Sequence, residues 1–154
     1  MIKISPHFTW DDVIVTQHRN IDNSIPTGLR NNALLTAAKL EVVRMALYSS
    51  PITVNSWFRC LELNTAIGSK PTSDHTKATA IDFTASGFGS PIEICKKLVA
   101  DKDTIGFKQL ILEHSWVHIS WDHSPGVVPK LEVLSLLKSG GYAVGLTDNQ
   151  GRIL

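Results

Sequence analysis

The 154-residue sequence lacks the features that mark several common classes of protein. It has 15 Lys and Arg residues against 14 Asp and Glu residues, and this absence of a basic excess argues against a nucleic-acid partner. No window approaches the roughly 20 apolar residues that cross a bilayer, and the opening residues do not resemble an export signal. We therefore expect cytoplasmic synthesis without a signal peptide, and no membrane partner.

Cysteine is also scarce. Cys60 and Cys95 have neither the number for a disulfide framework nor CxxC spacing, so we expect two small buried apolar residues. Low-complexity segments and blocks of like charge are absent too, while 43% hydrophobic and 19% charged residues suit a compact fold. We expect a single domain over residues 1–154 that acts as a monomer.

Helical and strand patterns alternate along the chain. Leu35, Ala38, Val42 and Ala46 have helical spacing, which predicts that the longest helix lies within residues 27–50. Further helices are predicted at 61–68, 90–102 and 130–141, strands at 52–57, 79–84, 107–113 and 116–121, and a small hairpin around 148–151. This order predicts an α+β fold with a small antiparallel sheet backed by helices.

The strands at 79–84 and 116–121 each carry a potential metal ligand between apolar residues. Because side chains alternate between the faces of a strand, Asp82 and His118 both lie opposite the apolar face. If one sheet contains both strands, they share its open face, and His75 can join them from the preceding loop. Two imidazoles and one carboxylate suit catalytic zinc, which keeps a fourth position for water. The alternative interpretation is a surface histidine and a strand-edge aspartate without metal.

Three segments in a fixed order carry a family resemblance: SWFRCLELNTAIG at 56–68, SDHTKATAIDF at 73–83 and QLILEHSWVHISW at 109–121. Together they resemble the zinc peptidases of the D-alanyl-D-alanine carboxypeptidase type, which have a hedgehog-like fold. This group includes bacterial carboxypeptidases and phage endolysins that act on peptidoglycan. The resemblance covers about residues 8–124, and the tail at 125–154, with its predicted helix, is expected to pack back onto the domain.

The resemblance assigns roles to individual residues. It implies one zinc ion per chain, with His75, Asp82 and His118 as its ligands. It also implies that Arg59 holds the carbonyl or carboxylate of the substrate, a role that suits a guanidinium with two parallel N–H donors. Ser73, two residues before the first ligand, would hydrogen-bond the substrate.

The resemblance assigns the general base to Glu113, which lies five residues before His118. A tight turn at 113–115 would bring its carboxylate over the metal site, whereas in a continuous strand Glu113 would face away. The rival candidates in this region are His114, Asp122 and His123.

Two positions depart from the family pattern. Ala78 replaces a glycine and would be disfavoured in a loop that needs a positive φ. Trp57 replaces the glycine of an S-G-Y-R element, which changes the wall or floor of the cleft. Trp57 and Trp116 suit the core at least as well as the cleft, and Trp121 is the better surface candidate.

The resemblance implies hydrolysis of a peptide bond in the stem peptide or cross-link of peptidoglycan, by a D,D-carboxypeptidase or an endopeptidase. It also implies a phage or prophage lysin that reaches the cell wall after release, or as part of a virion. Two alternatives remain: a non-catalytic zinc-containing relative that binds peptides or proteins, and a phage structural component without metal.

Overall fold

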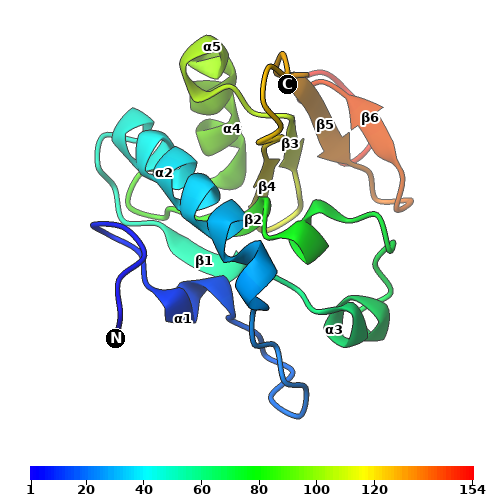
Figure 1. Cartoon of the computed structure of the whole chain (residues 1–154). Coiled ribbons are helices and arrows are strands. Elements are labelled where there is room, and N and C mark those ends of the chain that lie inside the picture. Colours follow the sequence, from blue (N-terminus) through cyan, green and yellow to red (C-terminus); the bar gives the residue numbers. More distant parts are fainter.

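The computed structural model describes residues 1–154 and shows a mixed α+β fold on a six-stranded sheet (Figure 1). The strands lie in the order β1-β2-β4-β3-β5-β6, and every neighbouring pair is antiparallel except β3 and β5. Their bounds are β1 Thr53–Ser56, β2 Ala80–Thr84, β3 Gln109–Leu112, β4 Val117–Ser120, β5 Glu132–Leu136 and β6 Tyr142–Val144. The helices are α1 Trp10–Val13, α2 Arg30–Ala46, α3 Leu61–Ala66, α4 Pro91–Ala100 and α5 Lys102–Ile105, with 3-10 turns η1 Thr27–Leu29 and η2 Asp74–Lys77.

Helices α2 and α4 cover one face of the sheet. A core of 23 buried residues joins Leu40 of α2 and Leu98 of α4 to the strand residues Ile81 and Ile119. The residues that alternate with these apolar side chains along the strands point to the opposite, open face of the sheet. Both strand residues that were predicted to bind metal lie on that opposite face.

The buried face of α2 differs from the predicted one. Its buried residues are Ala33, Thr36, Ala37, Leu40 and Val43. Leu35 and Ala38, both predicted to face the core, are exposed. The buried stripe of α2 is therefore shifted by about one position from the predicted one. The small Ala33 and Ala37 belong to the buried core, and Thr36 is buried because its hydroxyl has a partner there.

Most of the elements between residues 52 and 121 follow the prediction. Ser90 and Glu93 form the expected capping box of α4, with Pro91 at its first position. Strands β3 and β4 form the expected antiparallel pair. Helix α3 is followed by Gly68 at a φ of 74°, as its predicted end requires.

The helix predicted at 130–141 is absent, and this segment forms strand β5 instead. The chain follows Pro129 with Leu131 at a φ of 52°, which breaks helical geometry. Strand β5 then pairs in parallel with β3 and adds β6 beyond it, so the sheet is larger than predicted and not wholly antiparallel. The tight turn expected near 148–151 is present, closed by a bridge between Thr147 and Ile153.

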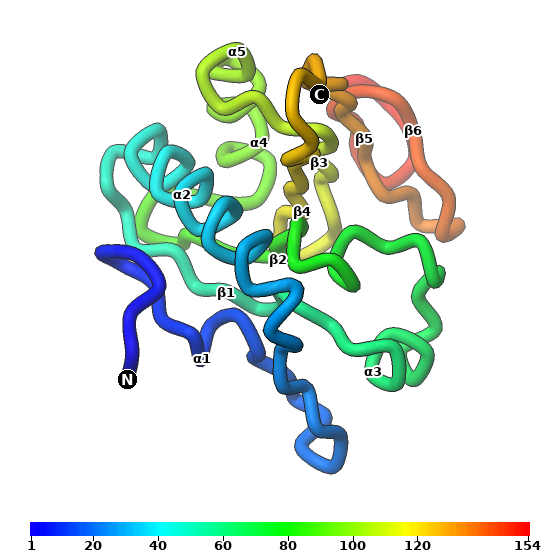
Figure 2. Tube along the Cα trace, in the orientation of Figure 1, coloured from blue at the N-terminus to red at the C-terminus, as the bar shows by residue number.

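The chain between α1 and α2 projects away from the sheet as a long loop (Figure 2). The residues of this loop that directly follow α1 line a cleft beside β1. None of the helices combines the length and the hydropathy that a bilayer crossing requires.

Candidate metal centre

The centre of the open sheet face is built by direct strand pairing. Asp82 of β2 lies opposite His118 of β4, and Ser56 of β1 lies opposite Asp82. Side chains of directly paired residues point to the same face, so these three form one row. The sequence prediction that Asp82 and His118 share a face is confirmed.

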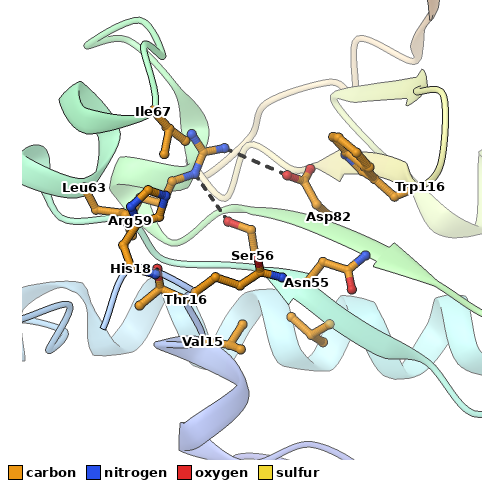
Figure 3. Close-up of a pocket in the computed structure, with 12 residues that line it drawn as sticks. Val15, Thr16, His18, Asn55, Ser56, Arg59, Leu63, Ile67, Asp82 and Trp116 are labelled. Carbon is orange, nitrogen blue, oxygen red and sulfur yellow. Dashed lines mark hydrogen bonds and ion pairs between the residues drawn. The ribbon is translucent and has the colours of Figure 1, made fainter. Parts of the chain in front are cut away.

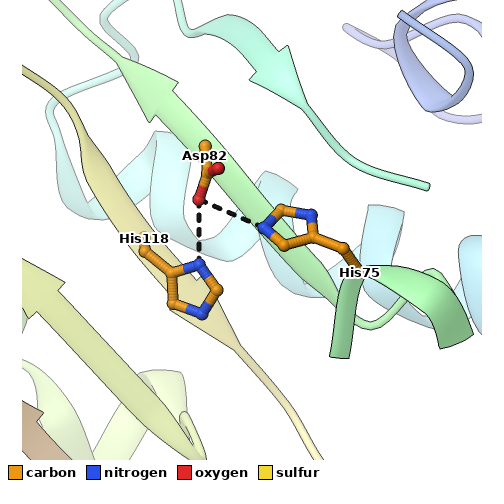
Figure 4. A group of neighbouring side chains, drawn as sticks. All are labelled: His75, Asp82 and His118. Carbon is orange, nitrogen blue, oxygen red and sulfur yellow. Dashed lines mark hydrogen bonds and ion pairs between the residues drawn. The ribbon is translucent and has the colours of Figure 1, made fainter. Parts of the chain in front are cut away.

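His75 joins the row from turn η2 (Figure 4). Its Nδ1 lies 2.6 Å from the backbone oxygen of Trp57. A carbonyl oxygen only accepts, so Nδ1 carries a proton, and in the neutral imidazole Nε2 then keeps its lone pair. This buried Nε2 has no hydrogen-bond donor, and it lies 3.2 Å from Oδ1 of Asp82, another acceptor. Two acceptors that face each other in a buried site repel, and a cation bound between or beside them would remove that repulsion.

His118 completes the cluster, with its Nδ1 2.8 Å from Oδ1 of Asp82. The donor atoms of His75, Asp82 and His118 all lie within 4.8 Å of one another, so the group can hold a metal ion. Two imidazoles and one carboxylate are a donor set that suits zinc. The backbone partner of His75 Nδ1 is the kind of outer hydrogen bond that orients a metal-binding imidazole.

The charge states of the cluster suit a cation. Burial lowers the pKa of His75, which favours the neutral imidazole that a metal needs. Burial acts to raise the pKa of Asp82, but the two neighbouring imidazoles outweigh it and hold that pKa below its usual range. The site therefore offers an ionised Asp82 carboxylate beside the neutral imidazole that burial favours at His75.

The loop that carries His75 ends at Ala78, which has a φ of 61°. The loop thus does need a left-handed conformation at this position, which costs a residue with a Cβ about 1–2 kcal/mol. Two buried donors hold the Ala78 carbonyl, the indole Nε1 of Trp57 at 3.1 Å and the hydroxyl of Thr36 at 3.0 Å. Thr36 is a supporting residue that could not be predicted from the sequence, because the carbonyl it contacts lies 42 positions away along the chain.

Arg59 lies beside the cluster in a cleft of about 520 Å³ (Figure 3). Its guanidinium donates to Ser56 Oγ at 3.3 Å and to Asn64 Oδ1 at 3.1 Å, and one nitrogen lies 3.9 Å from Asp82 Oδ2. Burial lowers the pKa of Arg59, while the charges of Asp82 and Glu113 raise it. A fixed cation thus lines the cleft next to the candidate metal site.

Glu113 follows β3 at a tight turn, one of the two geometries that the sequence allowed for it. Its N–H donates to the oxygen of Trp116 at 3.1 Å, which closes a short turn between β3 and β4. Glu113 therefore lies opposite Trp116 and on the same face as His118. Burial and the charge of Asp82 raise the pKa of Glu113, while His118 and Arg59 act to lower it.

The rival acids and bases lie elsewhere. His114 is exposed in the turn, and exposed Asp122 accepts a hydrogen bond from the N–H of Ser124. The Nε2 of His123 lies 2.8 Å from the hydroxyl of Thr36, behind the His75 loop. Of the candidate bases, Glu113 is the one whose charge interacts with the cluster.

Ser73 caps η2, and its hydroxyl accepts the N–H of His75 at 3.3 Å. It supports the loop that carries His75, and its contact with substrate stays a prediction. The prediction for Trp121 is wrong, because this residue is buried and its indole donates to the oxygen of Ile105. Trp57 is buried in the core, and Trp116 lines the cleft.

Cys95 is buried, as expected, whereas Cys60 is only partly buried and its sulfur caps α3.

A His-Asp-His cluster on the open face of an α+β sheet, with a cationic cleft beside it, belongs to a metal-binding domain. The family model described as Peptidase M15 matches residues 6–120, and the chain belongs to this family. A 60-residue stretch is 40% identical to the zinc D-Ala-D-Ala carboxypeptidase of Streptomyces albus G. That match covers 39% of this chain and 24% of the relative, so the chain corresponds to about a quarter of the relative's length.

Proposed function

We propose that the chain is a zinc-dependent peptidase that hydrolyses a peptide bond in peptidoglycan. The observation that carries the proposal is the bare Nε2 of His75, which faces the Asp82 carboxylate at 3.2 Å without a donor. Membership of the peptidase M15 family and the name of the matched relative support the reaction and the substrate class.

His75, Asp82 and His118 would hold the ion, with the Trp57 carbonyl fixing the tautomer of His75. When bound, zinc lowers the pKa of a coordinated water to about 7 and polarises a carbonyl. Three protein ligands leave room for that water. The neutral state of His75, favoured by its burial, keeps this donor available at neutral pH.

Glu113 would take the proton from the attacking water and return it to the leaving amine. Its pKa is raised by burial and by Asp82, which suits a carboxylate that must accept and then release a proton. Arg59 would bind the substrate carbonyl or its terminal carboxylate. Because Ser56 and Asn64 already hold the guanidinium, little ordering is needed on binding.

We propose further that the peptidase is either a D,D-carboxypeptidase or an endopeptidase, acting through the same site. A cationic Arg59 beside the cluster favours a substrate with a carboxylate near the scissile bond. The LILE element at residues 110–113 resembles the phage-type branch, and we propose a lysin or virion-associated peptidase on that resemblance.

The test combines metal content with activity on defined muropeptides. The purified chain should hold one zinc ion and cleave at least one stem or cross-link bond, as followed by mass spectrometry. Glu113→Gln should keep the zinc and lose at least a hundredfold in kcat. Asp103→Asn, which removes an exposed carboxylate on α5, is the matched control and should retain activity.

Each part of the proposal has a result that would overturn it. Zinc at full occupancy with no cleavage of any muropeptide would favour a peptide-binding module instead of an enzyme. A chain without zinc after purification in excess metal would contradict the metal site itself. Full activity in Glu113→Gln would remove Glu113 from the mechanism while leaving the class of enzyme intact.

A further inference from the structure

The open face of the sheet extends beyond the His-Asp-His cluster onto strands β5 and β6, whose residues lie outside the family match. The strand register aligns His118 of β4 with Ile111 of β3, then Leu134 of β5 and Val144 of β6. Directly paired residues share a face, so the last two stand on the same face as Asp82 and His118. Strands β5 and β6 thus extend the surface of the site, although the family model ends at residue 120.

A second row of residues runs parallel to the first. Leu112 pairs with Ser135, so Glu113 and Leu136 are the next neighbours along β3 and β5, and Leu136 pairs with Tyr142 of β6. Burial raises the pKa of Tyr142, and the negative charges of Glu113 and Asp82 add to the effect. Those electrostatic interactions agree with a phenol that lies toward the site.

Leu134, Leu136, Tyr142 and Val144 together form an apolar platform at this end of the sheet. Tyr142 is 52% exposed and Val144 is 87% exposed, while the two leucines are half-buried. None of the four side chains is ionised at neutral pH. The opposite side of the cluster is polar and cationic, with Ser56 and Arg59 in the cleft.

The two sides of the cluster therefore suit different parts of one extended substrate. A carboxylate on the leaving-group side suits the Arg59 cleft, which leaves the acyl side of the scissile bond to extend over β3, β5 and β6 (Figure 1). Three strand intervals separate β4 from β6, roughly 14 Å at about 4.8 Å each. An extended peptide covers that distance in about four residues.

We propose that the apolar platform binds the peptide segment on the acyl side of the scissile bond, up to about four residues before it. This inference rests on the proposed function, since it concerns the substrate of the same site. Aliphatic side chains packed on Tyr142 and Val144 would lose contact with water. Strands β5 and β6 would then select substrates by the length of the peptide before the scissile bond, while the reaction takes place at the His-Asp-His site.

The test compares two substrates that share the bond cleaved by the wild type, with one or four residues before it. The double variant Tyr142→Ala, Val144→Ser should raise KM for the longer substrate about tenfold, with kcat unchanged. The shorter substrate should show no change. Tyr142→Phe, which keeps the ring, should behave as the wild type.

Tyr48→Ala is the matched control, because Tyr48 is 78% exposed after α2 and packs against Phe88. It should leave both substrates unaffected. Equal effects of the double variant on both substrates, or no effect on either, would overturn the platform. A loss that appears only with a glycan-bearing substrate, and not with the free peptide, would assign the surface to sugar and contradict the inference.

Calorimetric binding of the longer peptide to Glu113→Gln separates this inference from the proposed function. If the wild type cleaves nothing but the double variant still weakens peptide binding about tenfold, the platform stands and the peptidase assignment fails. If the wild type cleaves both substrates and binding is unchanged in the double variant, the peptidase stands and the platform fails. Absence of both cleavage and binding contradicts both.

Discussion

Replacing Thr36 by valine tests whether α2 holds the metal-binding loop in place. The hydroxyl donates to the Ala78 carbonyl at 3.0 Å, and this oxygen also accepts from Trp57 at 3.1 Å. Thr36→Val keeps the shape of the side chain and removes one of the two donors, together with the contact between the hydroxyl and Nε2 of His123. Losing a buried hydrogen bond costs about 1–2 kcal/mol, and each kcal/mol lowers Tm by about 2–4 °C in a chain of this size.

A double-mutant cycle makes this prediction sharper. Trp57→Phe removes the second donor, and each single variant still leaves the Ala78 carbonyl with one partner. The double variant leaves a buried carbonyl without a donor, so its loss of unfolding free energy should exceed the sum of the single losses by about 1 kcal/mol or more. Urea unfolding in EDTA measures all four proteins without interference from metal.

Two results would contradict a role of α2 in holding the loop. If the losses of unfolding free energy in the two single variants simply add up in the double variant, then Thr36 and Trp57 do not act together on the Ala78 carbonyl. A Thr36→Val protein as stable as the wild type would mean that α2 does not hold the loop. Thr104→Val, at an exposed position on α5, is the control for the substitution itself and should change stability by less than about 0.5 kcal/mol.

Three further outcomes are expected. Zinc at a thousand times its Kd should raise the unfolding free energy of the wild type by about 4 kcal/mol, and thermal scans of Asp82→Asn should show no such rise. In native protein a maleimide should modify Cys60 and spare Cys95, whose pKa is raised to about 12 by burial; mass spectrometry before and after unfolding would reveal any labelling of Cys95. The metal-free chain should lose stability as pH falls through about 6.5, because burial lowers the pKa of His75 in the folded state and the unfolded chain takes up the proton first. A urea midpoint that is unchanged between pH 7.5 and 5.5 would contradict that linkage.

The parts of the fold and site that could be predicted are those governed by local patterns. Alternation along β2 and β4 put Asp82 and His118 opposite the apolar face of each strand, because the period of a strand is fixed by its backbone, and the direct pairing of the two strands then placed them on one face. The capping box of α4 was equally local. His75 could be suggested as a third ligand from its place in the preceding loop, but its assignment rested on the family resemblance, since nothing in a loop sequence alone fixes where its side chain points.

The parts that could not be predicted depend on distant partners. Residues 130–141 contain good helix formers, yet the exposed edge of β3 pairs with this segment and overrides that propensity. The burial of Thr36 depends on a carbonyl 42 positions away. The burial of Trp121 depends on an acceptor at Ile105, which removes the cost of burying its N–H.

Trp57 makes two hydrogen bonds to the loop that carries His75. Its carbonyl accepts from the His75 imidazole, and its indole N–H donates to the Ala78 carbonyl at the end of the loop. The same side chain is buried in the core. Because both bonds must break before the loop leaves a bound ion, we expect metal exchange to require local opening of the core around this tryptophan. The residence time of the ion should then follow the amide hydrogen-exchange rates of residues 74–79, and conditions that slow the opening should slow the loss of metal.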